Sequence, residues 1–151
     1  MIKAIAAALA LTATLAGCAV GTAPGAGAVN GDYKIPVYYV DGYRAAIAQA
    51  ERCLVGQGGY RVLHEIDEGQ RKAVVRVVAP LGDGEMASVT LAGIDAKNSN
   101  VRISMWGNSI WNQDALRAMR EAITYNLPSC TAFMPGDPQP TEEVWRRPAP
   151  R

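Results

Sequence analysis

The chain has 151 residues, of which 49% are hydrophobic and 19% charged, and its formal net charge is +1. This length fits one domain with a single hydrophobic core. The near-neutral balance, with a pI near 7.7, gives no basic field that would attract nucleic acid, and so argues against a nucleic acid as partner.

The first residues have the pattern of an export signal. A single positive charge, Lys3, is followed by an apolar run over residues 4–16 and then by small residues. The run is too short for a transmembrane helix, which needs ~20 apolar residues. The sequence therefore predicts a signal peptide over residues 1–17.

The segment Leu15-Ala16-Gly17-Cys18 resembles the lipobox of bacterial lipoproteins. The resemblance implies a diacylglyceryl group on the sulfur of Cys18, cleavage before it and acylation of the new amine. Two or more acyl chains anchor a protein stably in the lipid bilayer. The residue after this cysteine is Ala19 and not Asp. In this the chain resembles lipoproteins that are sent to the periplasmic face of the outer membrane. The alternative is an ordinary secretory peptide with an incidental Cys18.

The three cysteines are consistent with this prediction. With Cys18 used for lipid, Cys53 and Cys130 remain as a pair in an oxidising compartment and are predicted to form a disulfide. The alternative is two buried free thiols. If the two helices run antiparallel, the bridge requires either that the chain after Leu127 folds back along the layer or that the second helix lies across the sheet.

The amino-acid composition divides the rest of the chain into three segments. Residues 18–36 are rich in Gly, Ala and Pro, which predicts a lipidated Cys18 followed by a flexible tether. Residues 37–134 have enough apolar side chains for a single α+β domain. Residues 135–151 are rich in proline and charge and are predicted to be disordered. The tail sequence VWRRP could alternatively serve as a short peptide ligand.

The predicted domain begins with a helix. Asp41 is placed as its N-cap, its apolar positions are Tyr43, Ile47, Ala50 and Leu54, and the glycines from Gly56 end it. The stretch GQGG over 56–59 is therefore a helix stop, because phosphate-binding loops follow a strand and open a helix.

Four strand-like runs follow, over 60–66, 73–79, 85–94 and 100–106, joined by turns short enough for antiparallel hairpins. A second helix is predicted to start near Asn112, with Asp114 in its first turn, and to end at Pro128. Its buried residues are Leu116, Met119 and Ile123, and Trp111 is placed to pack on Leu116.

This order predicts an α+β fold: a four-stranded antiparallel meander with two helices packed on one face. The segment NVRISMWGNSIWNQDALRAMREAI passes from a last strand through a glycine turn into a final helix. In this respect the chain resembles small bacterial lipoproteins of uncharacterised function. The resemblance implies fold and location, and brings no agreed activity.

The sequence contains little evidence for a catalytic or a metal-binding site. His64 is the only histidine; it shares a strand face with Val62 and Ile66 while Glu65 points away, which predicts a half-buried structural histidine. One histidine and two bridged cysteines cannot supply a tetrahedral zinc site. Residues 95–100 are a hairpin turn, because Lys97 stands where a calcium loop needs an oxygen ligand. We therefore predict no catalytic residue, metal or cofactor.

Strand parity predicts a candidate binding face on the sheet side away from the helices. It mixes apolar groups with three arginines, at Arg61, Leu63, Val74, Arg76, Val78, Arg102 and Trp106. The alternative is that the tether or the tail folds over this face. The predicted function is a non-catalytic binding or structural module for an envelope protein or cell-wall polymer. The other candidate is an envelope enzyme with a non-histidine polar site, which a deep polar pocket would favour over a flat sheet face.

Overall fold

The structure is a computed structural model that describes residues 21–23, 26–57 and 59–131. The predicted signal peptide 1–17, the lipidation site Cys18 and the predicted tail 135–151 lie outside these residues. Among the helices described, none combines the length and the hydropathy that crossing a bilayer requires.

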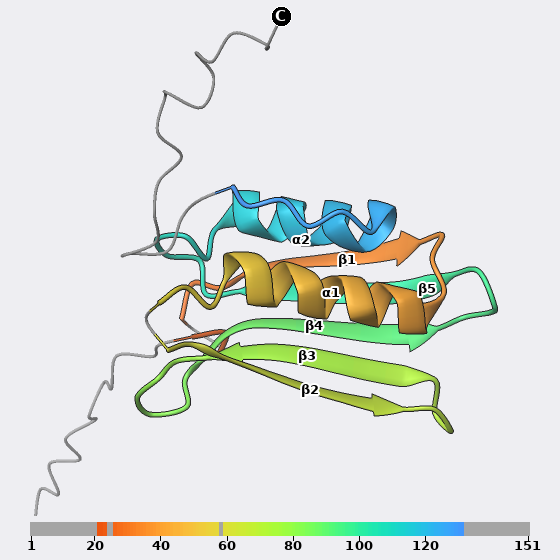
Figure 1. Ribbon diagram of the computed structural model, residues 1–151, viewed down its shortest axis with the longest axis horizontal. Helices are drawn as coiled ribbons and strands as arrows, with labels where there is room; N and C mark the ends of the chain where they lie inside the picture. The colour runs from red at the N-terminus through yellow and green to blue at the C-terminus, as the bar shows by residue number, and fades with distance from the viewer. Residues whose placement is uncertain (1–20, 24–25, 58, 132–151) are drawn as a thin grey trace, which may run out of the picture.

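The described chain folds into one antiparallel sheet with two helices on the same face (Figure 1). The strands lie in the order β1-β5-β4-β3-β2, and α1 and α2 lie along the strands and run in opposite directions. The α+β class is therefore as predicted. In chain order the elements are β1 (Val29–Ile35), α1 (Tyr39–Cys53), β2 (Arg61–Asp67), β3 (Lys72–Val78), β4 (Glu85–Gly93), β5 (Ser99–Met105) and α2 (Gln113–Tyr125).

The sheet has five strands in the described residues, so the prediction of a four-stranded sheet is wrong. The additional strand, β1, lies in the segment predicted to be a tether, and it pairs along its whole length with β5, from Val29 opposite Met105 to Ile35 opposite Ser99. Its residues alternate between partly buried and exposed positions until Ile35, which is buried. A strand with so few large apolar residues is stabilised by its ladder with β5 and by packing under α2.

Helix α1 begins earlier than predicted. Its N-cap is Tyr38, whose side chain makes no capping hydrogen bond. Asp41 lies in the first turn, where its negative charge interacts favourably with the helix dipole. The predicted cap at Asp41 is therefore wrong. The buried face consists mostly of small residues, which let the helix approach the sheet: a Cβ at Gly42 would lie 2.8 Å from Cδ2 of Leu91.

Helix α2 agrees closely with the sequence pattern. The side chain of Asn112 accepts hydrogen bonds from the backbone N–H groups of Asp114, at 2.9 Å, and Ala115, at 3.2 Å. Leu116, Met119 and Ile123 are buried as predicted, and Trp111 belongs to the same core cluster as Leu116. The helix ends at Asn126 in the left-handed conformation, two residues before Pro128.

The core lies between the helices and the covered side of the sheet. Its largest fully buried side chains come from both layers and include Leu91, Ile103, Met105, Leu116, Met119 and Ile123. Strands β2 to β5 agree with the predicted ranges to within one residue at each end. The hydrophobic pattern of these strands therefore also indicates which of their residues lie on the side of the sheet away from the helices.

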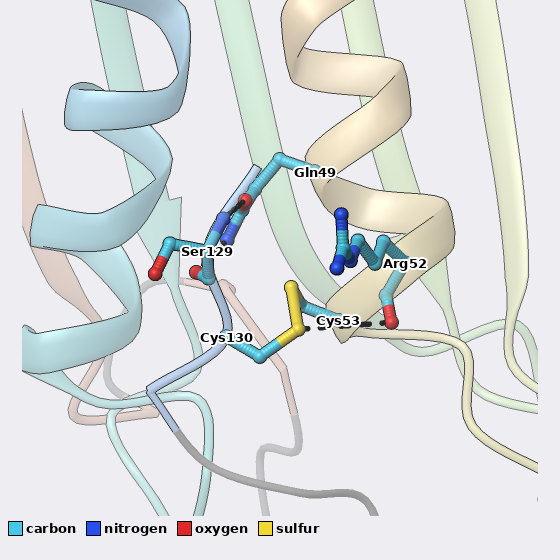
Figure 2. The surroundings of a disulfide bond; sticks show 5 residues. All are labelled: Gln49, Arg52, Cys53, Ser129 and Cys130. Atoms are coloured by element: carbon cyan, nitrogen blue, oxygen red, sulfur yellow. Dashed lines mark hydrogen bonds between the residues drawn. A yellow bond between two sulfur atoms is a disulfide. The ribbon is translucent and has the colours of Figure 1, made fainter. Parts of the chain in front are cut away.

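Cys53 and Cys130 form a disulfide (Figure 2). After α2 the chain turns back along the helix toward the C-terminal end of α1, which brings Cys130 to Cys53 while the two helices stay antiparallel (Figure 1). The buried side chain of Gln49 fixes this returning segment: its Nε2 donates to the Ser129 carbonyl and its Oε1 accepts from the Ser129 N–H, both at 2.8 Å. The Cys130 sulfur lies 3.8 Å from the Arg52 carbonyl oxygen, but a disulfide sulfur has no proton to donate.

Candidate functional site

The side of the sheet away from the helices is the candidate binding face, and we call it the open face. Directly opposed residues of an antiparallel pair share a face. One row across the sheet therefore consists of Leu63, Arg76, Ser88, Ser104 and Asn30, and the next consists of Glu65, Val74, Thr90, Arg102 and Asp32.

Five of the predicted residues lie on this face and are at least partly exposed: Arg61, Leu63, Val74, Arg76 and Arg102. Leu63 is 39% exposed, and Val74 and Arg76 are partly buried. Two of the arginines have acidic partners. Arg61 pairs with Asp83 in the β3–β4 turn, and Nε of Arg102 donates to Oδ1 of Asp32 at 2.7 Å. The hydrogen bond and charge of Asp32 raise the pKa of Arg102 above its ordinary value.

The predictions for Val78 and Trp106 need correction. Val78 is only 4% exposed, and Trp106 is partly buried and packs against the core. The backbone N–H of Thr22 donates to the carbonyl of Glu85 at 2.7 Å, and the backbone of Gly27 lies directly against Gly107. The segment before β1 therefore contacts this end of the sheet, at Glu85 and at Gly107.

The indole Nε1 of Trp106 is buried and finds no hydrogen-bond partner among the described residues. Trp106 thus cannot be treated as an exposed anchor. Its position next to Gly107, and the hydrogen bond from its backbone N–H to Met86, tie it to the ends of β4 and β5.

A wide hollow of about 530 Å³ lies where β1, β5 and β4 meet, and its lining includes the Asp32–Arg102 ion pair, Lys34, Thr90 and Asn100. Sequence reasoning missed Asp32 and Lys34 because it assigned them to the tether. The signal that could have found them is the alternation of polar and larger residues through 29–35. Charged and polar side chains line the hollow together with Tyr33, Ala92 and Val101, and it opens broadly on the sheet surface rather than forming a deep enclosed cavity.

His64 lies at the exposed β2 edge rather than in a half-buried position, so that part of the prediction is wrong. Its Nδ1 is 2.7 Å from the hydroxyl oxygen of Tyr43 on α1. Glu65 points to the other side of the strand, opposite Val74, as predicted. The histidine is therefore oriented by a tyrosine and not by its neighbouring carboxylate.

The acidic segment after β4 is a hairpin turn. Oδ1 of Asp95 accepts from the backbone N–H of Lys97 at 2.7 Å and of Asn98 at 2.8 Å. The bond from Lys97, followed by the side-chain bond from Asn98, lowers the pKa of Asp95. Within the described ranges no three His, Cys, Asp or Glu side chains gather to hold a metal ion.

No protein-family model and no curated protein matches the chain. Solved structures give distant likenesses. The di-domain ARO/CYC BexL matches with 12% identity and a TM-score of 0.34, over 66% of this chain and 45% of its own, so the chain spans less than half of that protein. Norcoclaurine synthase from Thalictrum flavum matches with 8% identity and a TM-score of 0.33, over 82% of this chain and 95% of its own. Such low scores assign neither a family nor an activity.

Proposed function

We propose that this chain is a lipid-anchored protein of the bacterial cell envelope, on the periplasmic face of the outer membrane, whose domain binds another envelope component without catalysing a reaction. The observation that carries the proposal is the Cys53–Cys130 disulfide. Structural disulfides are typical of exported proteins. The bridge also leaves Cys18, within Leu15-Ala16-Gly17-Cys18, as the odd cysteine of the chain.

The open face supports a binding role for the domain. The solvated side of a half-covered antiparallel sheet is usually polar, whereas here Leu63 and Val74 lie beside Arg76 on adjacent strands. Arg76 forms no ion pair with another described residue, unlike Arg61 and Arg102. An apolar pair beside an available guanidinium fits an envelope protein or a cell-wall polymer as partner.

Mass spectrometry of the protein extracted from membranes tests the anchor. The wild-type chain should begin at Cys18 and carry acyl chains there, and Cys18→Ala should remain uncleaved or be misrouted. The control variant, Cys53→Ser with Cys130→Ser, keeps Cys18 and should be acylated like the wild type. An unmodified N-terminus beyond Cys18 would show that the chain is not a lipoprotein.

Crosslinking in intact cells, followed by purification, tests the binding face. Val74→Glu with Arg76→Glu should abolish recovery of the native partner, because it removes the apolar contact and reverses the available charge. Trp106 is left unchanged because it packs against the core. The matched control is Arg117→Glu on the solvent-facing side of α2, which should recover the partner normally. Equal recovery from both variants, with equal melting temperatures, would exclude this face.

A further inference from the structure

The free edge at β2 is the least covered part of the described sheet. Every residue of β2 except Val62 is exposed, and the strand pairs only with β3. Leu63 and Ile66 are 39% and 38% exposed, on opposite sides of the strand. An edge strand presents a row of backbone N–H and C=O groups that can pair with another strand.

The outer residues of β2 are complementary to each other when the strand is reversed, although Leu63 then lies opposite Glu65. If β2 of a second copy pairs antiparallel with His64 opposite His64, then Arg61 lies opposite Asp67 of the second copy. In the same register Val62 lies opposite Ile66 of the second copy. Each contact occurs twice across the two-fold axis. Opposite charges and apolar pairs directly across an antiparallel ladder are both favourable.

This register also uses the whole strand. His64 is the central residue of Arg61–Asp67, so all seven residues of each β2 find a partner. A register centred on Leu63 would pair Arg61 with Glu65, but it would overlap only part of the two strands. A register centred on Glu65 would place two carboxylates directly opposite each other, which is unfavourable.

The opposite edge of the sheet lacks this property. The central residue of β1 is Asp32, so full overlap of two β1 strands would place two aspartates opposite each other. The helix-side face of this edge is also covered, because the guanidinium of Arg120 on α2 lies 5.2 Å from the centre of the Tyr33 ring. The two edges therefore differ in both charge pattern and coverage.

We propose that the chain forms a symmetric homodimer by antiparallel pairing of two β2 strands centred on His64, so that one sheet continues across both copies. The contact is isologous, as is common for two-fold dimers. It uses the edge of the sheet and leaves the middle of the open face accessible. The dimer goes beyond the proposed function, because it depends neither on the lipid nor on the envelope partner.

Cysteine crosslinking of the full chain tests the register. Cysteines at His64 would lie directly across the axis, where Cα atoms are about 4.5–5.5 Å apart, within disulfide reach. His64→Cys, purified in detergent and oxidised with copper phenanthroline, should give a covalent dimer. Two cysteines at Ile66 would be offset by four residues, roughly 13 Å, which is too far. Ile66→Cys and the β1 variant Lys34→Cys should therefore stay at the wild-type background.

Sedimentation of the same full-length protein tests the charges. Arg61→Glu should weaken the dimer by roughly tenfold or more, because two favourable pairs become repulsive. Adding Asp67→Arg should restore it. Asp83→Asn is the matched control: it removes the partner of Arg61 within the chain and should leave dimerisation unchanged.

Any of the following results would overturn the proposal: a monomer at all concentrations, crosslinking at Ile66 or Lys34 as efficient as at His64, or failure of Asp67→Arg to rescue Arg61→Glu. Crosslinking of position 64 to a different protein, with no dimer of this chain, would also overturn it. Loss of acylation at Cys18 would contradict the proposed anchor and leave these results unaffected.

Discussion

The two sides of the sheet are stabilised by different interactions. On the covered side, Leu91, Ile103 and Met105 are completely removed from solvent beneath the helices. On the open face, the ion pair of Asp32 with Arg102 joins side chains that are 66% and 69% exposed. Burial of a large apolar side chain contributes about 1.5–3 kcal/mol, whereas exposed ion pairs contribute little. The covered side therefore carries most of the stability.

This difference is present between adjacent residues of one strand. Arg102 and Ile103 are neighbours in β5, and alternation sends one to the open face and the other into the core. Substitutions on the open face should alter binding with little effect on the free energy of unfolding. Substitutions on the covered side should lower the free energy of unfolding with little direct effect on binding. The following predictions test this separation, from the largest expected effect to the smallest.

Removal of the disulfide should have the largest effect. The cysteines are separated by 77 residues in sequence, and closing such a loop contributes about 4 kcal/mol in the chain-entropy model. Cys53→Ser with Cys130→Ser should lower the free energy of unfolding by this amount in urea denaturation. Wild-type protein under reducing conditions should show the same loss. An unchanged midpoint in both samples would contradict a structural role.

Truncation of a core residue on the covered side should cost slightly less. Ile103→Ala removes a fully buried side chain from β5 and should lower the free energy of unfolding by about 3 kcal/mol. The control is Thr90→Ala, exposed on the open face, which should change stability by less than about 0.5 kcal/mol. Similar losses for both variants would refute the separation between the two sides.

The features that the sequence predicted correctly are those with local causes. Asn112 caps α2 through bonds to residues two and three positions later, and Leu116, Met119 and Ile123 repeat with helical spacing. The strands from β2 to β5 are bounded by short turns. Each of these patterns is contained in a few consecutive residues, so the sequence alone predicts it.

The features that were missed depend on contacts between distant segments. Strand β1 has few large apolar residues and is held by pairing with β5, about 70 residues later in the chain. Val78 is buried and Trp106 is partly buried. Both lie at the end of the sheet where Thr22 is hydrogen-bonded to Glu85 and Gly27 lies against Gly107. No local pattern in β3 or at the end of β5 indicates this burial, so the candidate face was predicted too large at one end and too small at the other.

Loss of the Gln49 side chain should have an intermediate effect on the covered side. Gln49 is 2% exposed and makes two hydrogen bonds to the backbone of Ser129. Gln49→Leu should cost about 2 kcal/mol, because it leaves the Ser129 N–H and carbonyl without these partners. Hydrogen exchange should become faster at Ser129 and stay unchanged in β4. Unchanged exchange at Ser129 would show that the disulfide alone holds this segment.

Removal of the ion pair on the open face should change stability only slightly. Arg102→Gln eliminates the bond to Asp32 between two exposed side chains. The melting temperature should fall by much less than for Ile103→Ala, and the difference from wild type should shrink as salt is added. The same variant in high salt is its own control. A large decrease that does not depend on salt would indicate that Arg102 also has a packing role.

The smallest effect is expected at the turn after β4, and it should depend on pH. Hydrogen bonds from the backbone N–H of Lys97 and the side chain of Asn98 lower the pKa of Asp95 in the folded protein. A carboxyl group with a lowered folded pKa stabilises the protein above its unfolded pKa, near 3.9, and loses this contribution as the pH falls through the folded value.

Asp95→Asn keeps one acceptor oxygen, so at neutral pH its melting temperature should be only slightly below that of the wild type. The difference should disappear in acid, because the wild-type carboxylate is then protonated. A difference that stays constant from neutral to acidic pH would show that the charge of Asp95 does not stabilise the turn.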